Sequence, residues 1–223
     1  MNLSFSQFCL LLSGLISVTL VPNTQAYSLE GKSWPDGTIT MQMELGFPSQ
    51  PLQDGSNTWN EAAVPALYDW NAVMRDIQLA AVMDSTKAVS SGDGVNSASF
   101  SSTVFGDSFG TDVLAVSYYR SQGTTLVEAD ILFNKSQPFD SYRTDLQFNS
   151  QGKCICDIQR VFLHEMGHSL GLDHPDDAGQ HVVAVMNSVV SNVSQLAADD
   201  ISGIQFLYGT PSRTPPPTPS PGA

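Results

Sequence analysis

Positions 164–174 read His-Glu-Met-Gly-His-Ser-Leu-Gly-Leu-Asp-His and fit the pattern HExxHxxGxxH at every fixed position. Residues four apart on an α-helix lie on one face, so His164 and His168 can point their imidazoles at the same metal ion. Gly171 can adopt the positive φ that ends a helix, and the resulting turn returns His174 as a third nitrogen ligand. The stretch therefore predicts a three-histidine metal site at the end of a helix.

The ligand set indicates the kind of metal site. Three protein nitrogens leave the fourth tetrahedral position open for water, which is typical of catalytic zinc. Zinc lowers the pKa of that water toward 7, and Glu165 is placed to take its proton and to pass it to a departing amine. We therefore expect one catalytic zinc on His164, His168 and His174, with Glu165 as the catalytic residue. The fourth histidine, His181, is expected at the surface.

The amino-acid composition argues against some classes of binding partner. The chain has 223 residues, of which 41% are apolar and 14% charged, and its formal net charge is -13 with nine Lys and Arg. So negative a protein repels phosphate backbones and anionic membrane surfaces, which argues against nucleic acid as a partner. We expect a monomeric protein with protein or peptide substrates.

The two ends of the chain differ from the middle. Residues 1–26 carry no charged side chain, and the apolar run 8–21 is followed by Thr24-Gln25-Ala26, with small residues where a signal peptidase needs them. This predicts a signal peptide over 1–26 and a secreted, extracellular or periplasmic protein without stable membrane association after cleavage. Residues 211–223 contain six prolines and predict a disordered tail, which leaves 27–210 as the catalytic domain. Cys154 and Cys156 could form a disulfide that closes a small ring, or they could remain two free thiols, and the sequence does not decide between these states.

Periodicity predicts the main elements. Apolar residues recur every three or four positions over 57–76, which favours a helix, although Pro65 breaks its start. Asp157 is expected as the N-cap of a helix that runs to about residue 170, and Gly209 ends a last helix that begins near residue 197. Alternating or β-branched residues predict strands at 38–45, 98–105, 113–119 and 126–133, the last two separated by a turn at 121–123.

With these residues in place, the sequence resembles the metzincins, and within that clan the matrixins, particularly the short bacterial-type members. Val185-Met186-Asn187 follows His174 by about a dozen residues and resembles the Met-turn, in which Met186 would form an apolar floor beneath the metal. Residues 196–209 resemble the matrixin C-terminal helix, and 157–163 lead into the motif as in those proteins. A weaker match places Leu114 and Ala115 on the strand that borders the cleft and pairs with substrate backbone.

The resemblance implies an α/β (α+β) metzincin, or zincin, fold. It would contain a twisted, mostly parallel five-stranded sheet with one antiparallel edge strand, two long helices, and a small C-terminal subdomain that ends in a third helix. A peptide would add to the edge strand, and its side chain after the cut would enter a pocket walled by the segment after Met186. No histidine precedes His164, so a second, structural zinc is not expected. Asn134 replaces an Asp that often helps to bind calcium, so calcium stays possible without a located site.

The sequence leaves other functions open. The chain could be a catalytically silent zinc or peptide-binding protein, or a specialised zinc amidase that acts on small or cell-wall peptides. The intact Glu165 favours a hydrolase, because a binding module has no need of a base. Serralysin-like or astacin-like membership is the alternative within the same chemistry, and the matrixin-like C-terminal helix argues against it.

Overall fold

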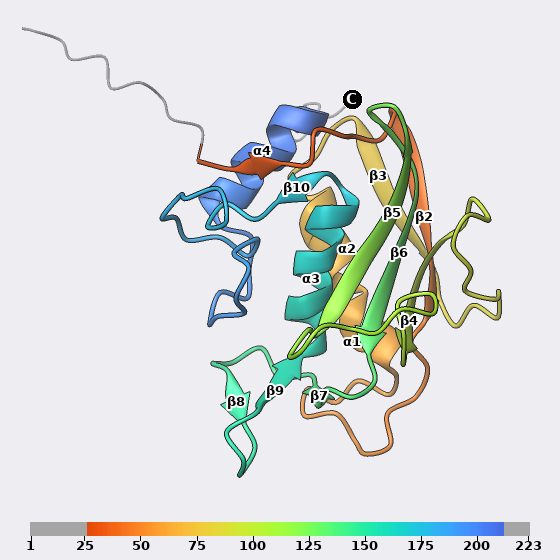
Figure 1. The fold of residues 1–223 in the computed structure, drawn as a ribbon, viewed down its shortest axis with the longest axis vertical. Coiled ribbons are helices and arrows are strands. Elements are labelled where there is room, and N and C mark those ends of the chain that lie inside the picture. The colour runs from red at the N-terminus through yellow and green to blue at the C-terminus, as the bar shows by residue number, and fades with distance from the viewer. Residues whose placement is uncertain (1–25, 212–223) are drawn as a thin grey trace, which may run out of the picture.

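The computed structural model describes residues 26–211 (Figure 1). The predicted signal peptide and proline-rich tail lie outside the described residues, apart from Ala26 and Pro211 at their inner ends. Over the range 26–211, no helix is both long enough and apolar enough to cross a membrane.

A five-stranded mixed sheet forms one layer of the molecule, in the order β3-β2-β4-β6-β5. The pairs β2/β3, β2/β4 and β4/β6 are parallel, and β5 pairs with β6 antiparallel at one edge. This agrees with the predicted α/β fold. The strands are β2 (Gly37–Glu44), β3 (Ile77–Val82), β4 (Asn96–Ser101), β5 (Ala115–Gln122) and β6 (Thr125–Asn134).

Helices cover one face of this sheet, and Figure 1 shows α2 and α3 side by side there. The predicted long helix over 57–76 is wrong in its extent: it is two short helices, α1 (Trp59–Ala63) and α2 (Pro65–Asn71). Pro65 has no N–H to continue the hydrogen bonds of α1, but its fixed φ suits the first position of α2. One of the two long helices expected is therefore broken at this proline.

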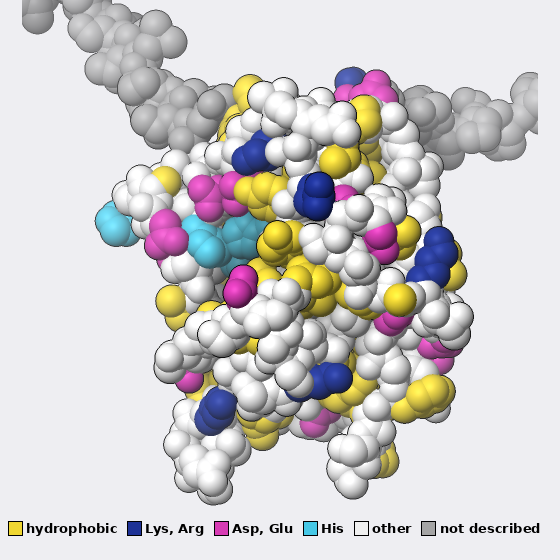
Figure 2. Space-filling view, turned by 45° about the vertical axis from the view of Figure 1, so that its right-hand side comes forward, with side chains coloured by type: hydrophobic (Ala, Val, Ile, Leu, Met, Phe, Trp, Pro, Cys, Tyr) yellow, Lys and Arg dark blue, Asp and Glu magenta, His cyan; other side chains and the backbone are white. Residues whose placement is uncertain are grey.

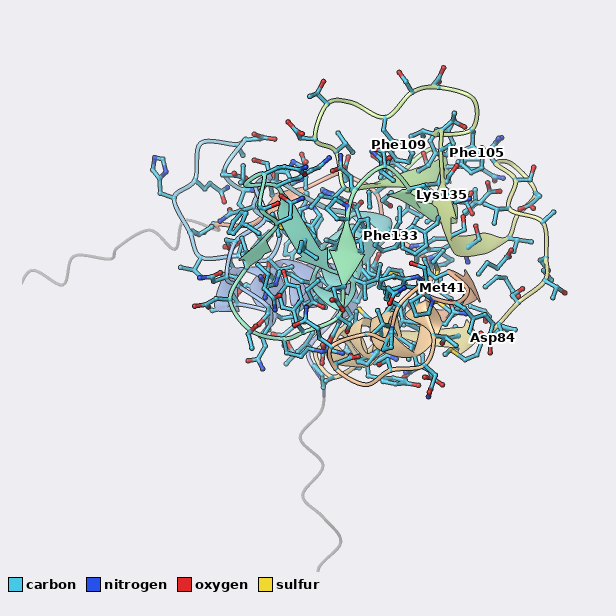
Figure 3. All side chains as sticks on the ribbon, turned by 90° about the horizontal axis from the view of Figure 1, so that it is seen from below. Met41, Asp84, Phe105, Phe109, Phe133 and Lys135 are labelled. Atoms are coloured by element: carbon cyan, nitrogen blue, oxygen red, sulfur yellow. A yellow bond between two sulfur atoms is a disulfide. The ribbon has the colours of Figure 1, made fainter. Side chains whose placement is uncertain are left out.

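The space between sheet and helices is filled with large apolar side chains. Met41 and Phe133 come from the sheet and are fully buried, and Figure 3 shows both inside the molecule. Trp70 of α2 is also fully buried, and its indole N–H donates to the carbonyl of Leu163 at 3.0 Å. This core fixes α3 (Ile158–Ser169) against the sheet, and α3 carries the first two histidines of the motif.

Smaller elements close the two ends of the molecule. Below α3 lie β7 (Phe139–Asp140), β8 (Gln147–Phe148) and β9 (Cys154–Asp157), in the order β7-β9-β8 (Figure 1). A disulfide joins Cys154 to Cys156. At the other end, β1 (Ser28–Leu29) pairs with β10 (Leu172–Asp173), next to α4 (Ala198–Tyr208).

Asp157 stands at the N-cap of α3 as predicted, but its side chain makes no capping hydrogen bond. Its Oδ1 accepts instead from the backbone N–H of Tyr142 at 3.4 Å. The carboxylate therefore ties the segment before β8 to the start of α3.

Candidate metal centre and cleft

The three histidines of the motif come together as the sequence predicts. The Nε2 atoms of His164 and His168 lie 3.1 Å apart, and the Nε2 atom of His174 lies 3.2 and 3.0 Å from them. His164 and His168 project from adjacent turns of α3. Gly171, at φ 101°, turns the chain after the helix so that His174 returns to the same point.

Each imidazole is oriented through its other nitrogen. Nδ1 of His164 lies 2.8 Å from the carbonyl oxygen of Val185. Nδ1 of His168 lies 2.9 Å from the carbonyl oxygen of Leu172. A carbonyl can only accept, so both Nδ1 atoms carry the proton and both Nε2 atoms present lone pairs. In His174, Nδ1 lies 3.0 Å from the carboxylate of Asp177, which favours the same tautomer.

This arrangement fits a zinc ion. Three Nε2 lone pairs facing one another repel unless a cation lies among them, and a mutual hydrogen bond would need a proton that Nδ1 already holds. Two nitrogen ligands of a tetrahedral zinc, each about 2.0–2.1 Å from the metal, lie about 3.3 Å apart. The observed separations are close to that value.

The protonation of the site also suits metal binding. Burial, and after it the neighbouring His168, lower the pKa of His164 to about 3. Burial likewise lowers the pKa of His168 to about 4, with His174 as the next cause. Both imidazoles are therefore neutral near pH 7, which is the form that binds a metal.

A second group of potential ligands lies beside the first. It consists of Glu30, His168 and Asp173. It shares His168, whose Nδ1 is already engaged with a carbonyl and lies 4.0 Å from the Glu30 carboxylate. The three-histidine group is the better metal site, because its free lone pairs converge on one point.

Glu165 lies in the wall of the cleft beside the histidines. Its side chain is 6% exposed. Burial raises its pKa to about 8, and a hydrogen bond from the Ser117 backbone acts in the opposite direction. The structure thus places a carboxyl group that can hold and release a proton near neutral pH next to the candidate metal centre.

Met186 packs directly against α3 at Gly167. A Cβ atom on Gly167 would overlap its sulfur, and would lie 3.0 Å from its Cε and 3.3 Å from Cζ2 of Trp70. Glycine at position 167 is therefore what lets Met186 reach the helix backbone. The motif pattern leaves this position free, so sequence reasoning missed the role of Gly167.

Asp200 is a second residue whose role the sequence did not reveal. It is 1% exposed, and it accepts from the backbone N–H groups of Val185, Met186 and Ala197 at 2.9, 3.1 and 2.7 Å. Asp200 also lies in the first turn of α4, where a negative charge interacts favourably with the helix dipole. The carboxylate holds the turn that carries Met186, and the carbonyl of Val185 in that turn orients His164.

A cleft of about 660 Å³ runs past this centre. Leu114 and Ala115 line it, and Ala115 is the first residue of the edge strand β5. Figure 2 shows histidine side chains beside a hollow, with hydrophobic side chains on one side and acidic ones close by. The aliphatic part of the lining is Val113, Leu114, Ala115, Val116, Val161, Val185, Val189, Val190 and Val193.

The family model described as Matrixin matches residues 41–209, which is more than half of the chain. The chain is a matrixin. Matrixins are zinc metalloendopeptidases, so the family agrees with a zinc site at the converging histidines. The matched range contains the five-stranded sheet from Met41 onward, α4 and the residues that line the cleft other than Glu30.

Several curated proteins are similar to this matrixin. Matrix metalloproteinase-15 of Homo sapiens is 26% identical over 91% of this chain and 29% of its own length. Matrix metalloproteinase-16 of Homo sapiens is 31% identical over 53% of this chain and 19% of its own length. Interstitial collagenase of Oryctolagus cuniculus is 50% identical over 26% of this chain and 12% of its own length. The chain thus spans less than a third of the length of these relatives.

Proposed function

We propose that this matrixin is a secreted, zinc-dependent endopeptidase that hydrolyses peptide bonds in protein substrates. The observation that carries the proposal is the convergence of three Nε2 lone pairs next to a buried glutamate. His164, His168 and His174 would hold the zinc. When bound, zinc would act as a Lewis acid that polarises the carbonyl of the bond to be cut and makes water ionise near neutral pH.

Glu165 would be the general base and then the general acid. Its carboxylate would accept a proton from the attacking water and deliver it to the amine that departs. A pKa near the working pH suits a group that must both take and give a proton, and burial moves the pKa of Glu165 in that direction. A protein that only binds zinc or a peptide gains nothing from a buried glutamate at this position.

The substrate would lie along the edge strand β5. On its inner side this strand pairs with β6, and its outer edge borders the cleft at Leu114 and Ala115. An extended peptide can add to such an edge through main-chain hydrogen bonds. The apolar end of the cleft, with Val161 and Val190, would then take an apolar side chain.

The domain plan completes the proposal. We propose residues 1–26 as a signal peptide, 27–210 as the catalytic domain and 211–223 as a proline-rich tail, on the sequence pattern alone. The strong negative charge supports a protein that acts on protein substrates outside the cell as a monomer, without nucleic acid partners.

The test combines metal analysis with casein digestion by wild type and by Glu165→Gln. We expect one zinc per chain in both proteins and digestion only by wild type, abolished by a chelator. Glu61→Gln is the matched control, because it makes the same change at an exposed carboxylate on α1 and should keep full activity. Zinc without digestion by wild type would point to a silent binding protein or a specialised amidase, and absence of zinc would refute the proposal.

A further inference from the structure

Asn134 is a buried polar residue at the end of β6, where that strand leaves the edge strand. Its side chain and backbone are 5% exposed. Its backbone N–H donates to the carbonyl of Leu114 at 2.9 Å, and its side-chain Nδ2 donates to the carbonyl of Val113 at 2.9 Å. One residue thus holds two successive carbonyls of the segment that leads into β5.

The surroundings fix which way the amide points. Oδ1 of Asn134 accepts from the backbone N–H of Ser136 at 3.0 Å and from its hydroxyl at 2.8 Å. A backbone N–H needs an oxygen opposite it, and the carbonyl of Val113 needs an N–H. The amide therefore has its oxygen toward Ser136 and its nitrogen toward Val113.

The segment held in this way has few other backbone hydrogen bonds, although the side chain of Leu114 packs against the core. Regular pairing between β5 and β6 begins at Ala115, which is opposite Phe133. Before that point, residues 111–114 form no strand, and the N–H of Val113 makes only a long hydrogen bond of 3.3 Å to the carbonyl of Gly110. Figure 3 shows the loop that carries Phe105 and Phe109 outside the sheet, near Lys135.

Both residues held by Asn134 line the cleft next to the candidate metal centre. We propose that Asn134 is a positioning residue for substrate binding, because its side-chain amide and its backbone N–H hold the carbonyls of Val113 and Leu114 at the edge where a peptide would pair. This inference rests on the proposed function for the statement that a peptide lies along this edge. Asn134 itself does not line the cleft that holds the histidines.

Aspartate at position 134 would have nearly the same shape as asparagine, but it would repel the carbonyl of Val113 where asparagine donates a hydrogen bond to it. A carboxylate oxygen in place of Nδ2 would face the carbonyl of Val113 with lone pairs on both atoms, and the buried charge would have only Ser136 as donor. Asn134→Asp therefore removes the side-chain hydrogen bond to Val113 with a change of a single atom, and it leaves the backbone hydrogen bond to Leu114 in place.

The experiment measures peptide binding without turnover. A labelled casein peptide that spans a bond cut by wild type is titrated into the zinc-loaded Glu165→Gln protein, with and without Asn134→Asp. A buried hydrogen-bonding group left unpaired is costly, so we expect the Kd of the peptide to rise about tenfold. Asn96→Asp is the matched control, because Asn96 also accepts from a backbone N–H and donates to a carbonyl in the same sheet, away from the cleft. It should leave Kd unchanged.

Hydrogen exchange of the peptide-free protein gives a second measurement. We expect the amides of residues 110–117 to exchange about tenfold faster after Asn134→Asp, with no change near the histidines and one zinc still bound. If Asn134→Asp does not fold, Ser136→Ala removes one of the two donors that orient the amide and should raise Kd about two- to threefold.

An unchanged Kd in Asn134→Asp, or an equal rise in Asn96→Asp, would overturn the inference while proteolysis by wild type still supports the proposed function. Loss of zinc in Asn134→Asp would also overturn it, because the residue would then act on the metal centre. A wild-type protein that cuts no casein would overturn the proposed function, and this inference with it.

Discussion

Replacement of Glu165 by glutamine should stabilise the metal-free protein while it abolishes turnover. Burial raises the pKa of Glu165 to about 8, whereas a carboxyl group in the unfolded chain titrates at its ordinary value of 4.5. Between these two values the unfolded chain loses the proton and the folded protein keeps it. The contribution of Glu165 to the free energy of unfolding therefore falls as pH rises from about 4.5 toward 8.

The size of the effect follows from the same pKa. One pH unit corresponds to about 1.4 kcal/mol, and pH 7 lies about 2.5 units above the unfolded pKa, so the penalty at pH 7 is about 3 kcal/mol. At pH 5 it is below about 1 kcal/mol. Glutamine has nearly the same volume and no charge at either pH, so it does not carry this penalty.

The assay is urea unfolding of chelator-treated wild type, Glu165→Gln and Glu61→Gln at pH 5 and pH 7. The stability gain from Glu165→Gln should grow from below about 1 to about 3 kcal/mol, while the exposed control shows no such change. With zinc bound the gain should shrink, since a nearby cation favours the ionised carboxylate. A gain that is the same at pH 5 and pH 7 would refute the argument from burial.

Three further predictions follow from the site. Because the folded pKa values of His164 and His168 lie near 3 and 4, each histidine should cost the metal-free protein about 1.4 kcal/mol of stability per pH unit as pH falls below about 6.5. A flat urea-unfolding profile of Glu165→Gln between pH 6.5 and pH 4.5 would contradict this, because that variant lacks the opposing titration of Glu165. Gly167→Ala should cost about 1–3 kcal/mol by overpacking in wild type but should cost little after Met186→Ala, and additive effects in this double-mutant cycle would exclude the contact. Asp200→Ala leaves three backbone N–H groups unpaired and should weaken zinc binding about tenfold, as measured by competition with a chelator. An unchanged affinity would show that the turn around Met186 keeps its conformation without the Asp200 carboxylate.

The convergence of the three histidines was predictable from the sequence because its geometry is local. His164 and His168 are four residues apart on one helix, and Gly171 provides the turn that brings in His174. These contacts lie within eleven residues of chain, so helix geometry and one glycine determine them. The hairpin formed by β5 and β6 was also predictable, because its two strands follow each other in the chain and the turn between them has its own sequence signal.

The missed features depend on contacts between distant parts of the chain. Strand β3 was not predicted, because its pairing partner Gly37–Gln42 lies about 40 residues earlier. The roles of Gly167 and Asp200 appear only once Met186 is placed against the helix. No periodicity in the sequence reports such contacts, since each depends on how separate elements pack.

Without a metal, the arrangement of the candidate site lowers the stability of the folded protein, and the histidines and Glu165 both contribute to this. Three lone pairs face one another beside a carboxyl group that burial keeps protonated near neutral pH. A cation at the meeting point of the histidines would relieve the repulsion between them and would also favour the ionised Glu165. Zinc binding should therefore stabilise the fold and create the ionised base in one step. The core around Trp70 and the buried Asp200 carboxylate hold this arrangement in place before the metal arrives.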